Sequence, residues 1–172
     1  MERCPYMVNV SVRHAEPDDA EAIHQILNGP RATAGTLRLL FQSVEGIRTR
    51  FFSETRERLY HLVARADGEV VGHLGLETFP ARWRRRHVGE IGMAVRDDWQ
   101  GRGIGPALME AALDLADNWL SLTRIELKVH TDNTAGDALY KKFGFEVEGT
   151  HHRYAFRNGH QYVDAHSMAC IK

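Results

Sequence analysis

The segment WQGRGIGPALM at residues 99–109 decides both the fold and the chemistry expected of this chain. It places three glycines, at positions 101, 103 and 105, between a predicted strand over 88–95 and a helix that Pro106 is predicted to open. The start of a helix offers backbone N–H groups without helical partners, and glycine lets an anion approach the backbone closely. The segment therefore predicts a site for a phosphate group.

Two familiar glycine patterns fit this segment poorly. A P-loop requires Lys and then Ser or Thr after its last glycine, whereas Pro106 and Ala107 follow Gly105. A Rossmann site requires its glycines directly after the first strand of a repeated βαβ array, whereas these glycines come late in the chain, after an antiparallel hairpin. On their own, the glycines also fit an ordinary strand-to-helix turn.

The residues after the glycines predict a βαβ unit. The helix has one apolar face, made of Leu108, Met109, Ala112, Leu113, Ala116 and Leu120. The strand RIELKVHT over 124–131 follows, so it should run parallel to the strand over 88–95 with a right-handed connection. A short helix over 134–143 then ends at Gly144, and two strands joined by an Asn158-Gly159 turn close the chain.

The residues before the glycines predict a further strand, two helices and a hairpin. The strand covers 10–13, the first helix runs from Glu16 to Asn28, and a second helix over 43–58 lies in the less regular stretch 31–59. The Asp67-Gly68 pair is the turn of a β-hairpin. Together these patterns predict one mixed α/β domain over 1–172, with 1–9 as a loosely ordered tail.

The composition excludes several classes of function. The chain has 22 Lys and Arg against 23 Asp and Glu, which leaves no overall charge for nucleic-acid binding. It has no membrane-length apolar run, no signal peptide and no disulfide framework, so a cytoplasmic protein without a membrane partner is expected. The histidine spacing indicates no metal site. The basic run over 82–87, which contains Trp83, would meet a phosphate or an acidic surface, or is a solvated loop.

The order of these features resembles the GNAT superfamily of N-acetyltransferases. The resemblance covers essentially the whole chain and rests on the QxxGxG pattern of Gln100, Gly103 and Gly105, with DNTAGDALYKKFGF over 132–145. The segments DNWL, RIEL and YKKFGFEVEGT look most like the YhhY-like bacterial members. The resemblance implies the GNAT fold, a mostly antiparallel mixed sheet flanked by helices, with one parallel βαβ pair splayed to admit the cofactor.

The resemblance also implies acetyl-CoA as the acetyl donor, with no metal. Its pyrophosphate would lie on the glycine turn, and its pantetheine arm would pair with the preceding strand, which would also supply an N–H to the thioester oxygen. The expected cofactor-binding residues are Met93, Ala94, Val95, Gln100, Gly101, Arg102, Gly103, Ile104, Gly105, Asn133 and Tyr140. Gly136 replaces the alanine that the family often has, which lowers helix propensity without an obvious benefit.

Acetyl transfer to an amine requires a base, and the departing thiolate benefits from a proton donor. Glu90 is the candidate base, and Tyr140 matches the tyrosine that donates the proton in the family. Many members carry the acid one residue earlier, at the position of Gly89, and a bulge in this strand would compensate for the reversed face. A solvated carboxylate and a core aromatic are the alternative interpretations of Glu90 and Tyr140. Neither cysteine lies near the motifs, so direct transfer in a ternary complex is expected.

The resemblance favours a small-molecule primary amine as the acceptor, such as the α-amine of an amino acid whose carboxylate Arg31 would hold. The candidate acceptor-lining residues are Arg31, Thr36, Leu37, Glu77, Glu90, His130 and Tyr162. A protein or peptide N-acetyltransferase is the alternative. A non-catalytic acyl-CoA sensor would lose the base and the acid, so Glu90 and Tyr140 argue against it. Because the C-terminal strands of this family often pair between subunits, a homodimer is expected.

Overall fold

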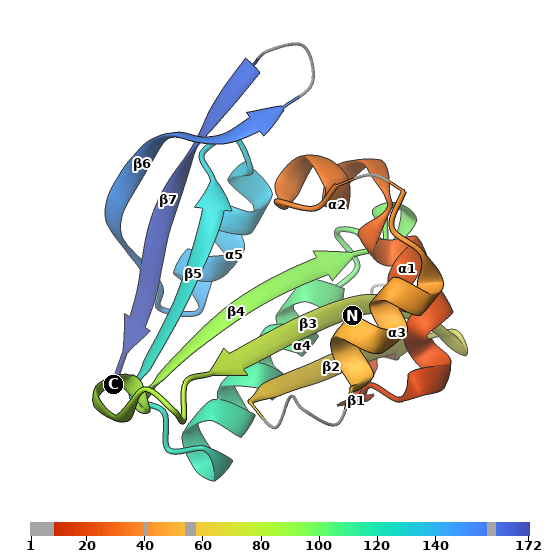
Figure 1. Ribbon diagram of the computed structural model, residues 1–172, viewed down its shortest axis with the longest axis horizontal. Coiled ribbons are helices and arrows are strands. Elements are labelled where there is room, and N and C mark those ends of the chain that lie inside the picture. The colour runs from red at the N-terminus through yellow and green to blue at the C-terminus, as the bar shows by residue number, and fades with distance from the viewer. Residues whose placement is uncertain (1–8, 40, 54–57, 158–160) are drawn as a thin grey trace, which may run out of the picture.

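The computed structural model describes residues 9–39, 41–53, 58–157 and 161–172, which form a seven-stranded sheet with helices on both faces (Figure 1). The strands are β1 (Ser11–His14), β2 (Leu59–Ala66), β3 (Glu69–Thr78), β4 (Val88–Val95), β5 (Arg124–His130), β6 (Glu146–Arg157) and β7 (Gln161–Ile171). The helices are α1 (Ala20–Leu27), α2 (Pro30–Gly35), α3 (Val44–Phe52), α4 (Ile104–Asp114) and α5 (Thr134–Lys142). Most of the predicted tail and the predicted Asn158-Gly159 turn lie outside the described residues.

The sheet contains one parallel pair of strands. The order is β1-β2-β3-β4-β5-β7-β6, and all neighbours are antiparallel except β4 and β5. Val88–Glu90 pair with Arg124–Glu126, and beyond these residues the two fully described strands do not pair with each other. The strands therefore diverge toward Val95 and His130, as Figure 1 shows. This arrangement confirms the predicted mixed sheet with a splayed parallel pair.

Two apolar cores hold helices against the two faces of the sheet. The larger core joins α4 and α5 to one face through buried residues such as Leu74, Leu108 and Leu127. The smaller core joins α1 and α3 to the other face through residues such as Ile23 and Val63. Helices α1, α2 and α3 thus lie on the side opposite α4 (Figure 1). Burying these side chains is the main free-energy gain of folding.

A glycine in β3 fixes how closely α4 approaches the sheet. A Cβ atom at Gly72 would lie 2.7 Å from Cγ2 of Ile104 and 2.9 Å from Cδ1 of Leu108. Both side chains are fully buried, so neither can move aside easily. The missing side chain therefore lets the first turns of α4 rest directly on β3, which positions the glycine turn beside β4.

The helices differ from the prediction in four places. Helix α1 begins at Ala20, after a 3-10 turn over Pro17–Asp19, and not at Glu16. Helix α3 ends at Phe52, and the four residues 54–57 of the predicted longer helix lie outside the description. Helix α4 begins at Ile104, two residues before Pro106, and a π-helical turn over Leu115–Trp119 follows it. Helix α2 was not predicted, because Gly29 and Pro30 indicated a stop. They end α1, and Pro30 also fits the first turn of a new helix.

Candidate active site

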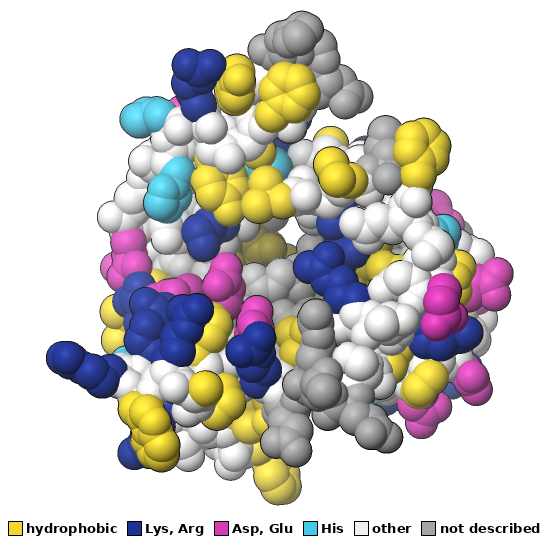
Figure 2. Space-filling model, in the orientation of Figure 1, with side chains coloured by type: hydrophobic (Ala, Val, Ile, Leu, Met, Phe, Trp, Pro, Cys, Tyr) yellow, Lys and Arg dark blue, Asp and Glu magenta, His cyan; other side chains and the backbone are white. Residues whose placement is uncertain are grey.

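A cavity of about 650 Å³ lies where β4 and β5 diverge. Figure 2 shows the corresponding face hollowed between the half formed by β5–β7 and the half that carries α1–α3. Five parts of the chain line the cavity: α2 with the residue after it, the end of β4, the glycine turn, α5 with the two residues before it, and the end of β6. The cavity is therefore formed by the three elements expected to bind the cofactor, together with α2 and the end of β6.

The glycine turn has the geometry of an anion site. Gly101 and Gly103 have φ angles of 73° and 85°, in the left-handed region that favours glycine. The first bond of α4 runs from the Ala107 N–H to the Gly103 carbonyl at 3.2 Å, so the N–H groups of Ile104 and Gly105 have no partner within the helix. Both residues line the cavity. Pro106 has no N–H and occupies a helix position that needs none.

The side chain of Gln100 joins the turn to two neighbouring elements. Its Oε1 accepts a hydrogen bond from Nη1 of Arg31 in α2, and its Nε2 donates to the Val95 carbonyl at the end of β4 at 3.4 Å. The backbone N–H of Arg31 also lies 3.4 Å from Oδ2 of Asp97. Gln100 thus holds α2 against the turn, a role that the sequence motif alone did not indicate.

The start of α5 places an amide at the cavity and explains Gly136. Oδ1 of Asn133 accepts the N–H of Gly136 at 3.0 Å and caps the helix. A Cβ atom at position 136 would lie 2.7 Å from Nδ2 and 3.0 Å from Cγ of Asn133. The glycine therefore makes room for the capping side chain, which is the benefit that the sequence did not reveal.

Tyr140 lines the cavity from α5 and is only 8% exposed. Its ring lies 6.0 Å from that of Phe145. Burial raises the pKa of the phenol to about 12, so the hydroxyl keeps its proton at neutral pH. A protonated phenol beside the cavity suits a proton donor, and the same packing makes Tyr140 part of the core.

Glu90 lies on the face of β4 opposite α4. The register between β3 and β4 is continuous over Gly72–Thr78, so the bulge considered for β4 is absent from this fully described pairing. A Cβ atom at Gly89 would lie 2.9 Å from Cδ1 of Leu122, within the α4-side core. Position 89 therefore faces the core and cannot hold a carboxylate without burying it, whereas Glu90 is partly exposed.

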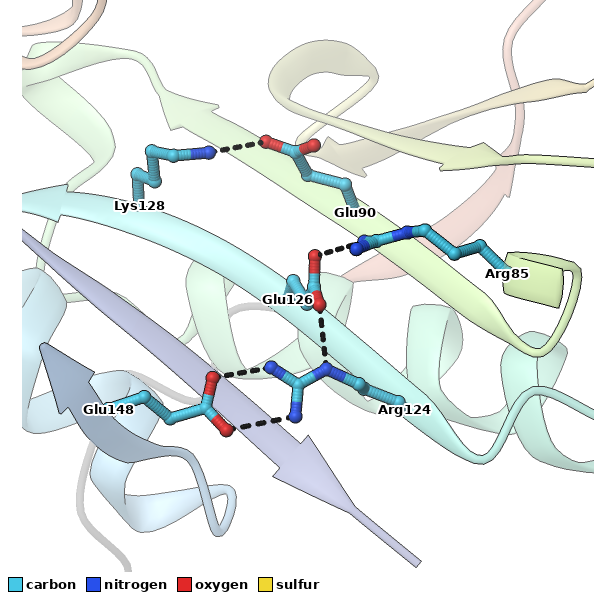
Figure 3. A network of polar contacts seen from close by, with 6 residues as sticks. All are labelled: Arg85, Glu90, Arg124, Glu126, Lys128 and Glu148. Carbon is cyan, nitrogen blue, oxygen red and sulfur yellow. Dashed lines mark hydrogen bonds and ion pairs between the residues drawn. The ribbon is translucent and has the colours of Figure 1, made fainter. Parts of the chain in front are cut away.

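Glu90 belongs to a network of ion pairs (Figure 3). Lys128 Nζ lies 3.4 Å from the Glu90 carboxylate. Glu90 on β4 also lies beside Glu126 on β5, and Arg85 and Arg124 contact Glu126 at 2.8 and 2.6 Å. Arg124 also contacts Glu148. On the other side Glu90 neighbours Glu77, which lies 3.6 Å from Arg58. Cations thus offset a row of carboxylates that would otherwise repel one another.

The cavity gathers most, but not all, of the expected site residues. Ten of the expected cofactor-binding residues line it; Arg102 does not, and its guanidinium lies 5.0 Å from the ring centre of Trp99. Of the expected acceptor residues, Arg31 and Thr36 line the cavity. The expected residues outside the lining are Leu37, Glu77, Glu90, His130 and Tyr162. Leu37 and Tyr162 are 63% and 52% exposed.

Two charged residues of the cavity, Asp132 and Arg157, were not among the site residues expected from the sequence. Arg157 pairs with Asp132 through both terminal nitrogens, and its Nη2 donates to Nδ1 of His130 at 3.0 Å. Burial lowers the pKa of His130, and the positive charge of Arg157 lowers it further. The pairing joins the end of β6 to the start of α5, and the position of Asp132 directly before Asn133 was the only available signal in the sequence.

The described residues contain no group of three or more potential metal ligands among His, Cys, Asp and Glu. Within the same residues, no helix is both long and apolar enough to cross a membrane.

Comparison with known proteins identifies the family. The family model of the acetyltransferase (GNAT) family matches residues 21–145, which include the glycine turn and Tyr140. The chain belongs to the GNAT family. It is therefore an acyltransferase that uses acetyl-CoA to acetylate an amine, whereas membership of the YhhY-like subgroup stays a prediction.

Several relatives of this GNAT enzyme match nearly its whole length. It is 43% identical to the L-amino acid N-acetyltransferase AaaT of Escherichia coli (strain K12) over 96% of this chain and 100% of that one. The solved structure of an N-acetyltransferase from Staphylococcus aureus Mu50 matches with a TM-score of 0.85, at 21% identity over 95% and 98% of the chains. The spermidine N-acetyltransferase of Vibrio cholerae, solved with CoA and spermine, matches with a TM-score of 0.83, at 22% identity over 94% and 95%. These structures share the fold.

Proposed function

We propose that this enzyme transfers the acetyl group of acetyl-CoA to the α-amine of a free L-amino acid. The observation that carries the proposal is the 43% identity with an L-amino acid N-acetyltransferase over nearly all of both chains. The site is compatible with this acceptor. Its cavity of about 650 Å³ has the size of a small-ligand site, and α2 and the end of β6 border it.

The residues of the cavity suggest how acetyl-CoA binds. The free N–H groups at Ile104 and Gly105 would receive the pyrophosphate, together with the positive end of the α4 dipole. The unpaired edge of β4 over 93–95 would bind the pantetheine arm, and an N–H of this edge would stabilise the thioester oxygen as negative charge develops. Asn133 would contact the arm from α5.

Two side chains would move protons during transfer. The neutral amine attacks the thioester carbonyl, a C–N bond forms, the C–S bond breaks, and the amine nitrogen releases a proton. Glu90 would accept that proton through water, because its side chain lies outside the cavity lining. Tyr140 would protonate the departing thiolate and regain its proton from solvent. The products are the N-acetyl amino acid and the free thiol of CoA.

A thiol-release assay tests the proposal. The purified enzyme and acetyl-CoA are combined with single L-amino acids, with spermidine and with short peptides, and kcat/KM is compared between the three classes. We expect turnover with at least one free amino acid to exceed that with any peptide or polyamine. Preferential turnover of peptides or spermidine would refute this assignment.

A further inference from the structure

Arg38 lies between α2 and α3, two residues after the cavity residue Thr36. Its Nη1 donates to Oε1 of Gln42 at 2.9 Å, and its guanidinium carbon lies 5.3 Å from the ring centre of Phe51. The side chain is half-buried. Within the described part of the chain, no carboxylate comes within ion-pair distance of it. The described residues therefore supply no negatively charged side chain to neutralise Arg38.

The other cations around the site have identified partners. Arg157 is paired with Asp132, and Lys128 with Glu90. Arg31 is bound to Gln100 on the turn, at the end of the cavity proposed for the pyrophosphate. Arg38 resembles Arg31 in having a neutral amide as its side-chain hydrogen-bond partner, but it lies on the segment between α2 and α3, away from the glycine turn.

The surroundings of Arg38 make its charge costly. Burial is the main cause that lowers the pKa of Arg38 to about 10, and repulsion from Arg50 is the second. A cation removed from water without a counter-charge destabilises the folded protein unless an anion binds it. The planar guanidinium suits a carboxylate, to which it can donate two parallel hydrogen bonds.

A stack of rings connects Arg38 to the sheet beside the cavity. Below Arg38, the ring of Phe51 lies 4.2 Å from that of His61 and 5.2 Å from that of His73. His73 pairs across the strands with Ala94, which lines the cavity. On the same face Gly92 is exposed, and a Cβ atom there would have no neighbour within 4 Å among the described residues. Figure 2 shows Lys and Arg side chains at the edge of the hollow on the side of α1–α3.

We infer that Arg38 binds the α-carboxylate of the acceptor amino acid, an inference that rests on the proposed function. Gln42 and the ring of Phe51 hold the guanidinium in place. Neither Arg38 nor Gly92 belongs to the cavity lining, so the acceptor would extend from the cavity over the exposed surface at Gly92. This role replaces the one that the sequence analysis gave to Arg31.

The test compares each acceptor with its own carboxamide, which lacks the negative charge. For every variant we measure the ratio of kcat/KM for the preferred L-amino acid to kcat/KM for its amide. This ratio does not depend on the fraction of folded enzyme, so a loss of stability cannot imitate the effect. In Arg38→Gln the ratio should fall about 10- to 100-fold, the range expected when a charge-assisted hydrogen bond is lost. In Arg38→Lys the ratio should lie between the values for Arg38→Gln and the wild-type enzyme.

The control is Arg48→Gln, since Arg48 is exposed on α3 and, among the described residues, forms an ion pair only with Glu45, at 3.4 Å. The ratio should stay at the wild-type value in this variant. An unchanged ratio in Arg38→Gln would overturn the role of Arg38 and leave the proposed function standing. Wild-type enzyme that acetylates peptides or polyamines but no amino acid would overturn both.

Discussion

At the scale of single residues, Tyr140 carries the sharpest mechanistic expectation. Its buried phenol, with a pKa of about 12, holds a proton beside the cavity. Tyr140→Phe keeps the ring that packs near Phe145 and removes only the hydroxyl. We expect kcat to fall about 100-fold or more, while the Kd for acetyl-CoA changes little. Steady-state kinetics and calorimetric titration measure the two effects, and an unaltered kcat would exclude Tyr140 as the acid.

A second residue-scale prediction concerns pH and stability. His73 is buried, and its Nε2 lies 2.9 Å from Nδ1 of His61. Burial is the main cause that lowers the pKa of His73 to about 3, and His61 and Arg38 contribute further. Because the unfolded histidine titrates near pH 6.5, its contribution to stability is present above pH 6.5 and is lost as pH falls toward 3. Between pH 7 and pH 5 the free energy of unfolding should decrease by about 2 kcal/mol from this group.

Denaturant titrations at both pH values measure this loss. His73→Gln keeps a polar side chain without a titrating group, so its stability should depend less on pH. His151→Gln, at an exposed position in β6, is the control and should retain the wild-type dependence. Equal pH dependence in wild type and His73→Gln would contradict the assignment to His73.

At the scale of elements, the contact between α4 and β3 positions the glycine turn. In Gly72→Ala the new methyl group meets the buried side chains of Ile104 and Leu108, so α4 must shift or the core must strain. We expect a loss of about 1–3 kcal/mol in the free energy of unfolding. Binding of acetyl-CoA should also weaken, because the turn begins this helix.

Gly149→Ala is the matched control, since a Cβ atom there meets no described atom within 4 Å. Thermal unfolding and titration with acetyl-CoA compare the two variants. If Gly72→Ala is destabilised but binds acetyl-CoA with wild-type affinity, the packing of α4 on β3 does not position the glycine turn for binding.

Many of the secondary-structure elements could be predicted from local sequence patterns. The Asp67-Gly68 hairpin, the glycine turn and the helix capped by Asn133 each depend on neighbouring residues, so they could be predicted. The six-residue helix α2 could not, since Gly29 and Pro30 end one helix as readily as they begin the next. The face of Glu90 was also undetermined, because it depends on the register between β3 and β4 rather than on β4 alone.

At the scale of the whole molecule, the acceptor side of the site depends on contacts between distant segments. Arg157 meets Asp132, Arg31 meets Gln100, and Arg38 reaches Phe51 only after folding. No spacing rule predicts such pairs. The cofactor side is different, because the glycine turn and α5 are contiguous motifs. The sequence therefore predicted most of the proposed cofactor site and little of the acceptor site.

Two whole-molecule expectations stay predictions. A single domain over 1–172 and a homodimer are both consistent with one continuous sheet whose edge strand, β6, is largely exposed. Sedimentation of the purified chain measures the second, and a monomer at all accessible concentrations would exclude it.

The central claim is that the acetyl group passes from acetyl-CoA to the α-nitrogen of a free amino acid. The most direct measurement uses acetyl-CoA labelled with carbon-13 at the carbonyl and the preferred L-amino acid labelled with nitrogen-15, followed by NMR. Our account predicts a one-bond carbon–nitrogen coupling that grows at the rate of thiol release. Thiol release with the label in free acetate or on the protein, and no coupled signal, would contradict it.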